Sequence, residues 1–387
     1  MAKTCRERKG DVEDLDSTVT TITALITQLQ TSTAPTPATG TAKIEVDALS
    51  LAHNTASLIR AHSTKLSLLI TNEPFTASAI TSILRELASG PLPGLAAAVE
   101  LCDSSYTIAM SEELRYQARR VFAALGNLIG AIPFHGTILS DDAKNGTGTT
   151  KGKGSLATTG AVWQACDAVM ELQQMRIAGL VVRKAEQYKA TLKDALEELQ
   201  EWGEEVSDGD EGDEAGSAEE DKAQATVDKI FGSQRHIPPE DSEKIRPRLE
   251  FFLKRLRLLI LMYQAIIKRR FKTLPRLPQP ASPPESKKTE KDAQGQLGCS
   301  RESNPDESTQ VVNRLNKVLE VMKKLPDTVD ELASAFYSLD QEGIDTAIDT
   351  CSSSSFAAIE LLLRNWEGKE DEFTAWAQKF QVAMKAA

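Results

Sequence analysis

Residues 158–175 read "TTGAVWQACDAVMELQQM", and this stretch sets the pattern on which the predicted fold depends. Six side chains recur at the spacing of one helix face: Val162, Trp163, Cys166, Val169, Met170 and Gln173. A nucleophilic thiol at Cys166 would need a neighbouring base, but no histidine lies close to it in the sequence. We therefore predict that this face, Trp163 included, packs in the core of a helical bundle.

The composition also favours helices. Of the 387 residues, 41% are hydrophobic, which is enough to form sizeable cores, but only 5% are aromatic. Sheets are usually richer in aromatic and β-branched residues. We expect an all-α fold. The formal net charge of −11 repels membranes and nucleic acids on average, although a local basic patch can reverse this.

Cysteine usage indicates a reducing compartment. The chain has five cysteines, an odd number, and no CxxC pair. No apolar signal-peptide region follows Met1, and the strongest apolar run, 258–263, is too short to span a bilayer. We expect reduced thiols in the cytosol or nucleus.

Apolar periodicity and changes in composition divide the chain. Helices are expected at about 15–29, 43–72, 76–88, 94–109, 112–132, 158–202, 311–325, 328–339, 343–366 and 370–383. A further helix is expected within 238–271, with a start signal at 238–242 and an apolar stripe from Leu249 to Ile266. Thr158 or Thr159 is the expected N-cap of the long central helix. The expected segments are a disordered tail at 1–10, an N-terminal bundle at 11–202 with a mobile loop at 133–157, an acidic linker at 203–237, and a C-terminal bundle at 238–387 with a disordered insert at 275–308. The final helices could instead complete the N-terminal bundle.

No catalytic, cofactor-binding or metal-binding motif is recognisable. His53 and His62 are nine residues apart and point to different sides of their helix. "GTGTTKGKGS" at 146–155 lacks the Gly-Lys-Ser/Thr ending of a phosphate-binding loop. A helical enzyme would need a pocket that unites His53 or His62 with carboxylates such as Asp103 or Asp167. We predict no enzymatic activity, no cofactor and no metal.

Charge segregation is the one feature that packing alone does not explain. Eleven Lys or Arg and a single Glu lie between Lys244 and Arg276, whereas 204–221 contains ten carboxylates and no cation. One interpretation is a solvated basic helix with an acidic spacer that folds back on it. The other is a partner-binding basic patch, for which the acidic arm competes, at Lys268, Arg269, Arg270 and Lys272. Nucleic acid is the less favoured partner because no stacking aromatics interleave with these charges.

Two serines are candidate regulatory phosphorylation sites. Ser207 lies in the acidic linker, and Ser282 precedes a proline. Phosphate at Ser207 would add charge to an already negative segment and would tighten its contact with the basic helix.

Three stretches resemble one known family. "AHSTKLSLLITNEPFTASAITSILRELASGPLPGLAAAVELC" (61–102), "TTGAVWQACDAVMELQ" (158–173) and "DTVDELASAFYSLDQ" (327–341) follow the order and spacing of the cyclin-D-binding proteins, also called Grap-and-cyclin-D-interacting proteins. The acidic insert followed by a basic helix is also similar.

The resemblance implies an all-α protein of two antiparallel helical bundles, vinculin/catenin-like in style, in nucleus and cytoplasm. It also implies a non-enzymatic adaptor that binds D-type cyclins or helix-loop-helix transcription regulators and negatively regulates cell-cycle progression. Its oligomeric state is not implied. A cytoskeletal or adhesion-type structural bundle is the alternative, because it would show the same periodicities.

Overall fold

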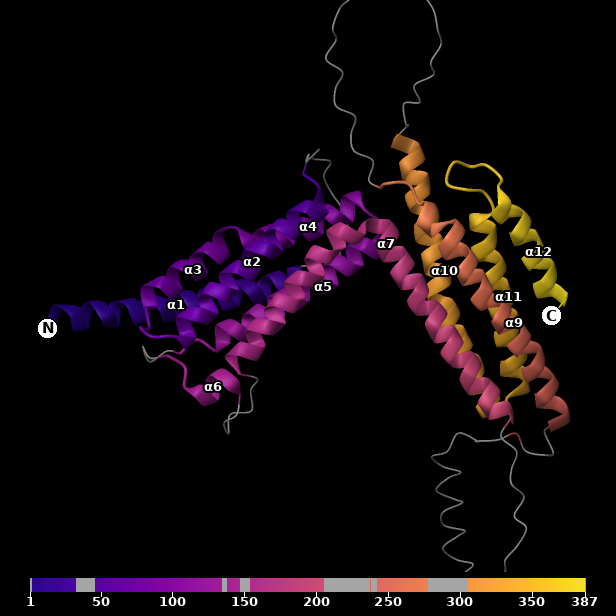
Figure 1. Ribbon diagram of the computed structural model, residues 1–387, viewed down its shortest axis with the longest axis horizontal. Helices are drawn as coiled ribbons and strands as arrows, with labels where there is room; N and C mark the ends of the chain where they lie inside the picture. Colours follow the sequence, from indigo (N-terminus) through magenta and orange to yellow (C-terminus); the bar gives the residue numbers. More distant parts are fainter. Residues whose placement is uncertain are drawn as a thin grey trace, which may run out of the picture. The chain divides into compact units, whose positions relative to one another are not determined.

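The computed structural model describes residues 2–32, 46–133, 138–146, 154–204, 237, 242–277 and 305–386 (Figure 1). Within these ranges every regular element is a helix and no residue belongs to a β-strand, which confirms the predicted all-α fold. None of the described helices has both the length and the apolar character that crossing a bilayer requires.

The chain forms two compact units, Met1–Ile177 and Ala178–Ala387. The division falls inside helix α7 (Ser155–Glu204), whereas the sequence pattern had placed it after residue 202. Arg176 interrupts α7 with φ 52° and ψ −168°, a backbone conformation that is strained for any residue except glycine. The apolar periodicity continues on both sides of Arg176, so the sequence alone gives no sign of this kink.

The first unit contains α1 (Ala2–Ser32), α2 (Ala48–Thr71), α3 (Ala77–Ser89), α4 (Pro91–Ser105), α5 (Ile108–Gly130), the short α6 (Asp141–Asn145) and the first part of α7. Helix α1 packs against α3 and α5, and α2 packs against α4. Their apolar stripes fill the core, where Ile59, Leu66, Leu84, Leu114 and Phe122 are fully buried.

Two expected irregular segments are corrected by the structure. Helix α1 begins at Ala2, so the predicted disordered tail at 1–10 is helical from its second residue. Helix α6 lies inside the predicted loop at 133–157 because Ser140 caps it: the Ser140 hydroxyl accepts a bond from the Ala143 amide at 3.3 Å. Helix α7 also begins at Ser155, one turn before the expected N-cap.

The second unit contains the rest of α7, α9 (Ser242–Arg269), the 3₁₀ turn η1 (Phe271–Thr273), α10 (Pro305–Tyr337), α11 (Gln341–Leu362) and α12 (Glu372–Ala386). Contacts from α9 reach Asp345, Ser352 and Leu362 in ascending order, so α9 and α11 run parallel. Helix α12 packs on α9 and α11, so it belongs to this unit and does not complete the N-terminal bundle.

Helix α10 continues through Pro326, where the sequence had indicated a break between two helices. Proline has no amide hydrogen, so the carbonyl four residues earlier, that of Met322, loses its helical donor. The buried hydroxyl of Tyr263 on α9 donates to that carbonyl at 2.6 Å. The tertiary bond therefore replaces the missing helical bond and allows the proline to be buried within α10.

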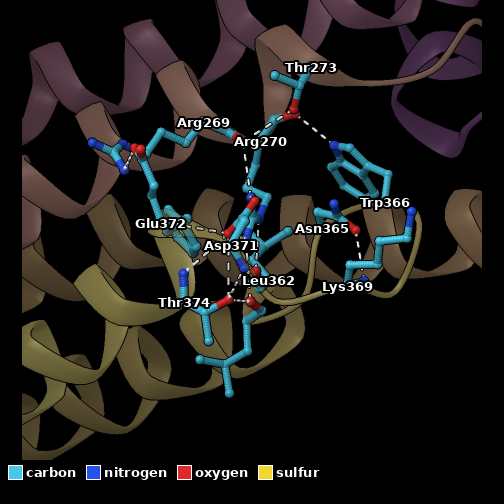
Figure 2. Close-up of polar contacts among 12 residues, drawn as sticks. Arg269, Arg270, Thr273, Leu362, Asn365, Trp366, Lys369, Asp371, Glu372 and Thr374 are labelled. Atoms are coloured by element: carbon cyan, nitrogen blue, oxygen red, sulfur yellow. Dashed lines mark hydrogen bonds and ion pairs between the residues drawn. The ribbon is translucent and has the colours of Figure 1, made fainter.

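The loop before α12 is fastened by Arg270, whose side chain is fully buried. Its guanidinium donates to both carboxylate oxygens of Asp371, at 2.7 and 2.9 Å, and to the carbonyls of Leu362 and Leu363 (Figure 2). Trp366 in turn donates its indole N–H to the Arg270 carbonyl at 2.7 Å. The Arg270 bond holds the pKa of Asp371 below its ordinary value of 3.8.

We expect Tyr263→Phe to lower the free energy of unfolding by about 1–2 kcal/mol, because it leaves the buried Met322 carbonyl without a donor. In a Pro326→Ala background the backbone amide can restore the helical bond, so the same change should cost less than about 0.5 kcal/mol. Urea unfolding of the four variants in this double-mutant cycle measures the difference. Equal costs in both backgrounds would show that the hydroxyl does not act through this carbonyl.

We expect Asp371→Asn to lower the free energy of unfolding by roughly 2 kcal/mol at pH 7, because Arg270 stays buried with only backbone carbonyls as partners. The folded pKa of Asp371 lies below 3.8, so its contribution is present above that pH and is lost as the pH falls through the folded pKa. Urea unfolding at pH 7 and pH 3 should therefore show a smaller difference at pH 3. Glu372→Gln, which removes the exposed pair with Arg269, is the control and should cost less than about 0.5 kcal/mol.

Candidate functional site

Polar side chains join α2 and α7 in the first unit, from the buried pair Thr159 and Ser67 to partly exposed pairs. The Thr159 hydroxyl bonds that of Ser67 at 3.0 Å, the Trp163 indole N–H donates to the Thr64 hydroxyl at 3.0 Å, and the Gln173 amide donates to the Ser50 hydroxyl at 3.0 Å. Arg60 and Asp167 form an ion pair at 3.1 Å. Because the positions on α2 descend as those on α7 ascend, these two helices are antiparallel.

Trp163 lies at the edge of this seam and not in the core. Val162, Cys166 and Val169 are buried as predicted, but 36% of Trp163 remains exposed. The Arg60 guanidinium lies 5.5 Å from the centre of the indole ring, close enough for a cation–π contact. The prediction that Trp163 packs in the core is therefore wrong, because a residue at the border of an apolar stripe can point along the surface.

A second arginine–aromatic pair lies on α5, on the other side of α7. Tyr116 is 59% exposed, and the Arg120 guanidinium lies 5.9 Å from its ring centre. Arg120 also lines a shallow hollow between α5 and α7 together with Asp167 of the first seam. The two pairs therefore belong to one surface, which we call the arginine–aromatic surface: Arg60, Thr64, Tyr116, Arg120, Trp163 and Asp167.

Exposed leucines extend this surface at one end. Leu68 is one helical turn beyond Thr64 on α2, and Leu156 is two turns before Trp163 on α7. Each of these leucines is 55% exposed, although their helices are otherwise well packed. The result is a strip that combines apolar side chains with cations and two aromatic rings.

The sequence prediction missed Arg60, Tyr116 and Arg120. One signal could have indicated Tyr116: Leu114, Ala118 and Val121 define the buried stripe of α5, and Tyr116 lies outside that stripe. Its place outside the stripe predicts that the side chain is exposed, although a single exposed aromatic does not by itself indicate a contact. That Arg120 and Asp167 line one hollow depends on tertiary packing and has no sequence signal.

The described cysteines are not suited to nucleophilic chemistry. Cys102, Cys166 and Cys351 are buried free thiols. Burial raises the pKa of each to about 12, so the reactive thiolate is scarce near neutral pH. The question raised by Cys166 is thus answered in favour of packing.

The predicted polar candidates do not converge. Asp103 pairs with Arg115 at 2.6 Å, Asp167 with Arg60, and His62 lies 3.6 Å from Glu86. His53 is close to its neighbour Asn54. Among the described residues, no three His, Cys, Asp or Glu side chains gather in a way that could hold a metal ion.

The predicted basic patch is only partly exposed. Lys268 and Lys272 are exposed, but Arg269 is paired with Glu372 at 3.1 Å. Arg270 is buried in the clamp on Asp371, which corrects its expected role as a surface docking residue. Ser207 and Ser282 lie outside the described residues, as do 205–236 of the predicted linker and 278–304 of the predicted insert. The first two linker residues belong to α7, and α10 already begins at Pro305, inside the predicted insert.

We expect a Cys5→Ser, Cys299→Ser chain, which retains only Cys102, Cys166 and Cys351, to be unreactive toward Ellman's reagent at pH 8 while folded. Burial and the raised pKa of each thiol are the physical reasons. Adding guanidinium chloride should release all three thiols. Rapid reaction of any thiol in the folded chain would contradict the buried, protonated state.

Comparison with curated proteins finds a relative in the fission yeast Schizosaccharomyces pombe, described as an uncharacterized protein. It is 22% identical to this chain over 334 residues, which cover 86% of this chain and 82% of the relative. The similarity therefore extends through both units and is not confined to the stretches that carry the arginine–aromatic surface.

Residues 52–205 match the family described as "Grap2 and cyclin-D-interacting, N-terminal". The matched range includes α3, α4, α5 and α7, most of α2, and every residue of the arginine–aromatic surface. This family is one of protein-interaction proteins. The match confirms the family resemblance predicted from the stretches at 61–102 and 158–173, whereas the stretch at 327–341 lies outside it. Over the matched residues the chain is similar to the Grap2 and cyclin-D-interacting family.

Proposed function

We propose that this protein is a non-enzymatic helical adaptor that binds a D-type cyclin or a helix-loop-helix transcription regulator and thereby restrains cell-cycle progression in nucleus and cytoplasm. The arginine–aromatic surface of the first unit is the proposed contact. Its location within the family match supports this assignment, because the family is described by its interaction with cyclin D.

The observation that carries the proposal is the exposure of two arginine–aromatic pairs on either side of α7. Trp, Tyr and Arg are the residue types that most often dominate binding energy at protein interfaces. They offer large, rigid contact areas with few rotatable bonds, so little conformational entropy is lost on binding.

The geometry suits a helix from the partner. The seam between α2 and α7 and the hollow between α5 and α7 run beside α7, and each is bordered by side chains of both signs. An amphipathic helix can place apolar side chains against Leu68, Leu156 and Trp163 and pair its charges with Arg60 or Arg120. Occupying a partner's helical surface in this way is sufficient for negative regulation and requires no catalysis.

We expect Trp163→Ala to weaken binding to a purified D-type cyclin by about 30-fold, since a central tryptophan typically contributes roughly 2 kcal/mol. Isothermal titration calorimetry measures the change, and circular dichroism checks that the variant remains folded. Phe251→Ala in the second unit is a matched control: Phe251 is also 36% exposed, with the Arg255 guanidinium 4.1 Å from its ring centre.

The Phe251 variant should bind the cyclin as tightly as the unmodified chain. An equal loss in both variants would place the contact elsewhere. If the unmodified chain binds neither a D-type cyclin nor a helix-loop-helix regulator, the cell-cycle assignment fails while the fold stands.

A further inference from the structure

A groove in the second unit lies between the end of α7 and the start of α9. Gly203 and Glu204 of α7 line one side, and Arg246, Leu253, Lys254 and Arg257 line the other side with Leu249 and Glu250. The two helices approach closely because residue 203 is glycine: a Cβ there would lie 2.5 Å from a methyl carbon of Leu249. Arg246 fixes the end of α7 by donating to the Gly203 carbonyl at 2.8 Å.

Two cations of this groove, Lys254 and Arg257, have no bonding partner among the residues that the structure describes, unlike the arginines of α9 that face α11. Arg248 binds Asp345 and Arg255 binds Ser352, so both are used in packing against α11. Lys254 and Arg257 are exposed and form no ion pair within the part of the chain that the structure describes. After Glu250, α9 contains no carboxylate, and the ten residues between Arg257 and Lys268 carry no charge.

The chain supplies a complementary segment at this place. Residues 205–221 follow directly after Glu204, which itself lines the groove, and nine of these seventeen residues are Asp or Glu with no Lys or Arg among them. Arg257 is about 17 Å along α9 from Arg246, at 1.5 Å per residue. Five extended residues span roughly the same distance, so Asp208, Asp210 and Glu211 can reach Lys254 and Arg257.

We propose that residues 205–221 occupy the α7–α9 groove, with their carboxylates on Lys254 and Arg257. The contact lies at the opposite end of α9 from Lys268 and Lys272, where the sequence pattern had placed the basic patch. Each exposed ion pair contributes little, but a short tether gives a local concentration of about a millimolar or more. The segment thus acts as a built-in competitor, and an acidic segment of another protein must displace it to reach these cations.

The test is binding of a fluorescein-labelled peptide of sequence 205–221 to the full chain, followed by anisotropy. A chain in which the nine carboxylates of 205–221 are replaced by Asn or Gln has an open groove. We expect it to bind the peptide about fivefold or more tightly than the unmodified chain. Adding Lys254→Glu and Arg257→Glu should abolish this binding, and raising the salt concentration should weaken it.

The matched control adds Lys268→Glu and Lys272→Glu to the open chain, which changes the net charge by the same amount at the far end of α9. This variant should keep most of the peptide affinity. Equal peptide binding by the unmodified and open chains would overturn the proposal, as would loss of binding in the far-end variant equal to that in the groove variant. Circular dichroism of all variants verifies that they are folded. None of these outcomes depends on a cyclin, so the result is independent of the proposed function.

Discussion

Burial of one apolar stripe per helix is the constraint on which the rest of the structure depends. Each fully buried Leu, Ile or Phe contributes roughly 1.5–3 kcal/mol, and both units contain many of them, such as Leu66, Phe122 and Phe252. The stripe fixes which face of each helix is inside. The surface side chains, including the arginine–aromatic pairs, are placed only after this choice is made.

Buried polar groups then select one arrangement among those that the stripes permit. The Tyr263 hydroxyl finds the single carbonyl that Pro326 leaves without a donor, and Arg270 finds Asp371 with two carbonyls beside it. A shift of either helix by one turn would leave these groups buried without partners, at a cost of several kcal/mol. Such contacts therefore specify register more than they add stability.

Helix positions were largely predictable from the sequence, because periodicity reports burial directly. The helix expected at 76–88 is α3 at Ala77–Ser89. What the sequence could not reveal depended on tertiary partners: the rescue of Pro326 by a tyrosine 63 residues away in sequence, the backbone turn at Arg176, and the burial of Arg270. The site was less predictable still, since the pattern that marks Trp163 as apolar does not say whether it faces inward or along the seam.

Helix α7 belongs to both units, and this limits where the chain can be divided into separately folding fragments. Its residues up to Ile177 belong to the first unit, while Leu180, Leu192 and Leu199 are buried in the second. A fragment that ends after residue 204 would keep the second part of α7 without the helices that cover it. Its apolar face would then be exposed to solvent. The two parts of the chain on either side of the acidic stretch are therefore poorly suited to exist as separate proteins. A protein that consisted only of the first part would have an aggregation-prone C-terminal helix.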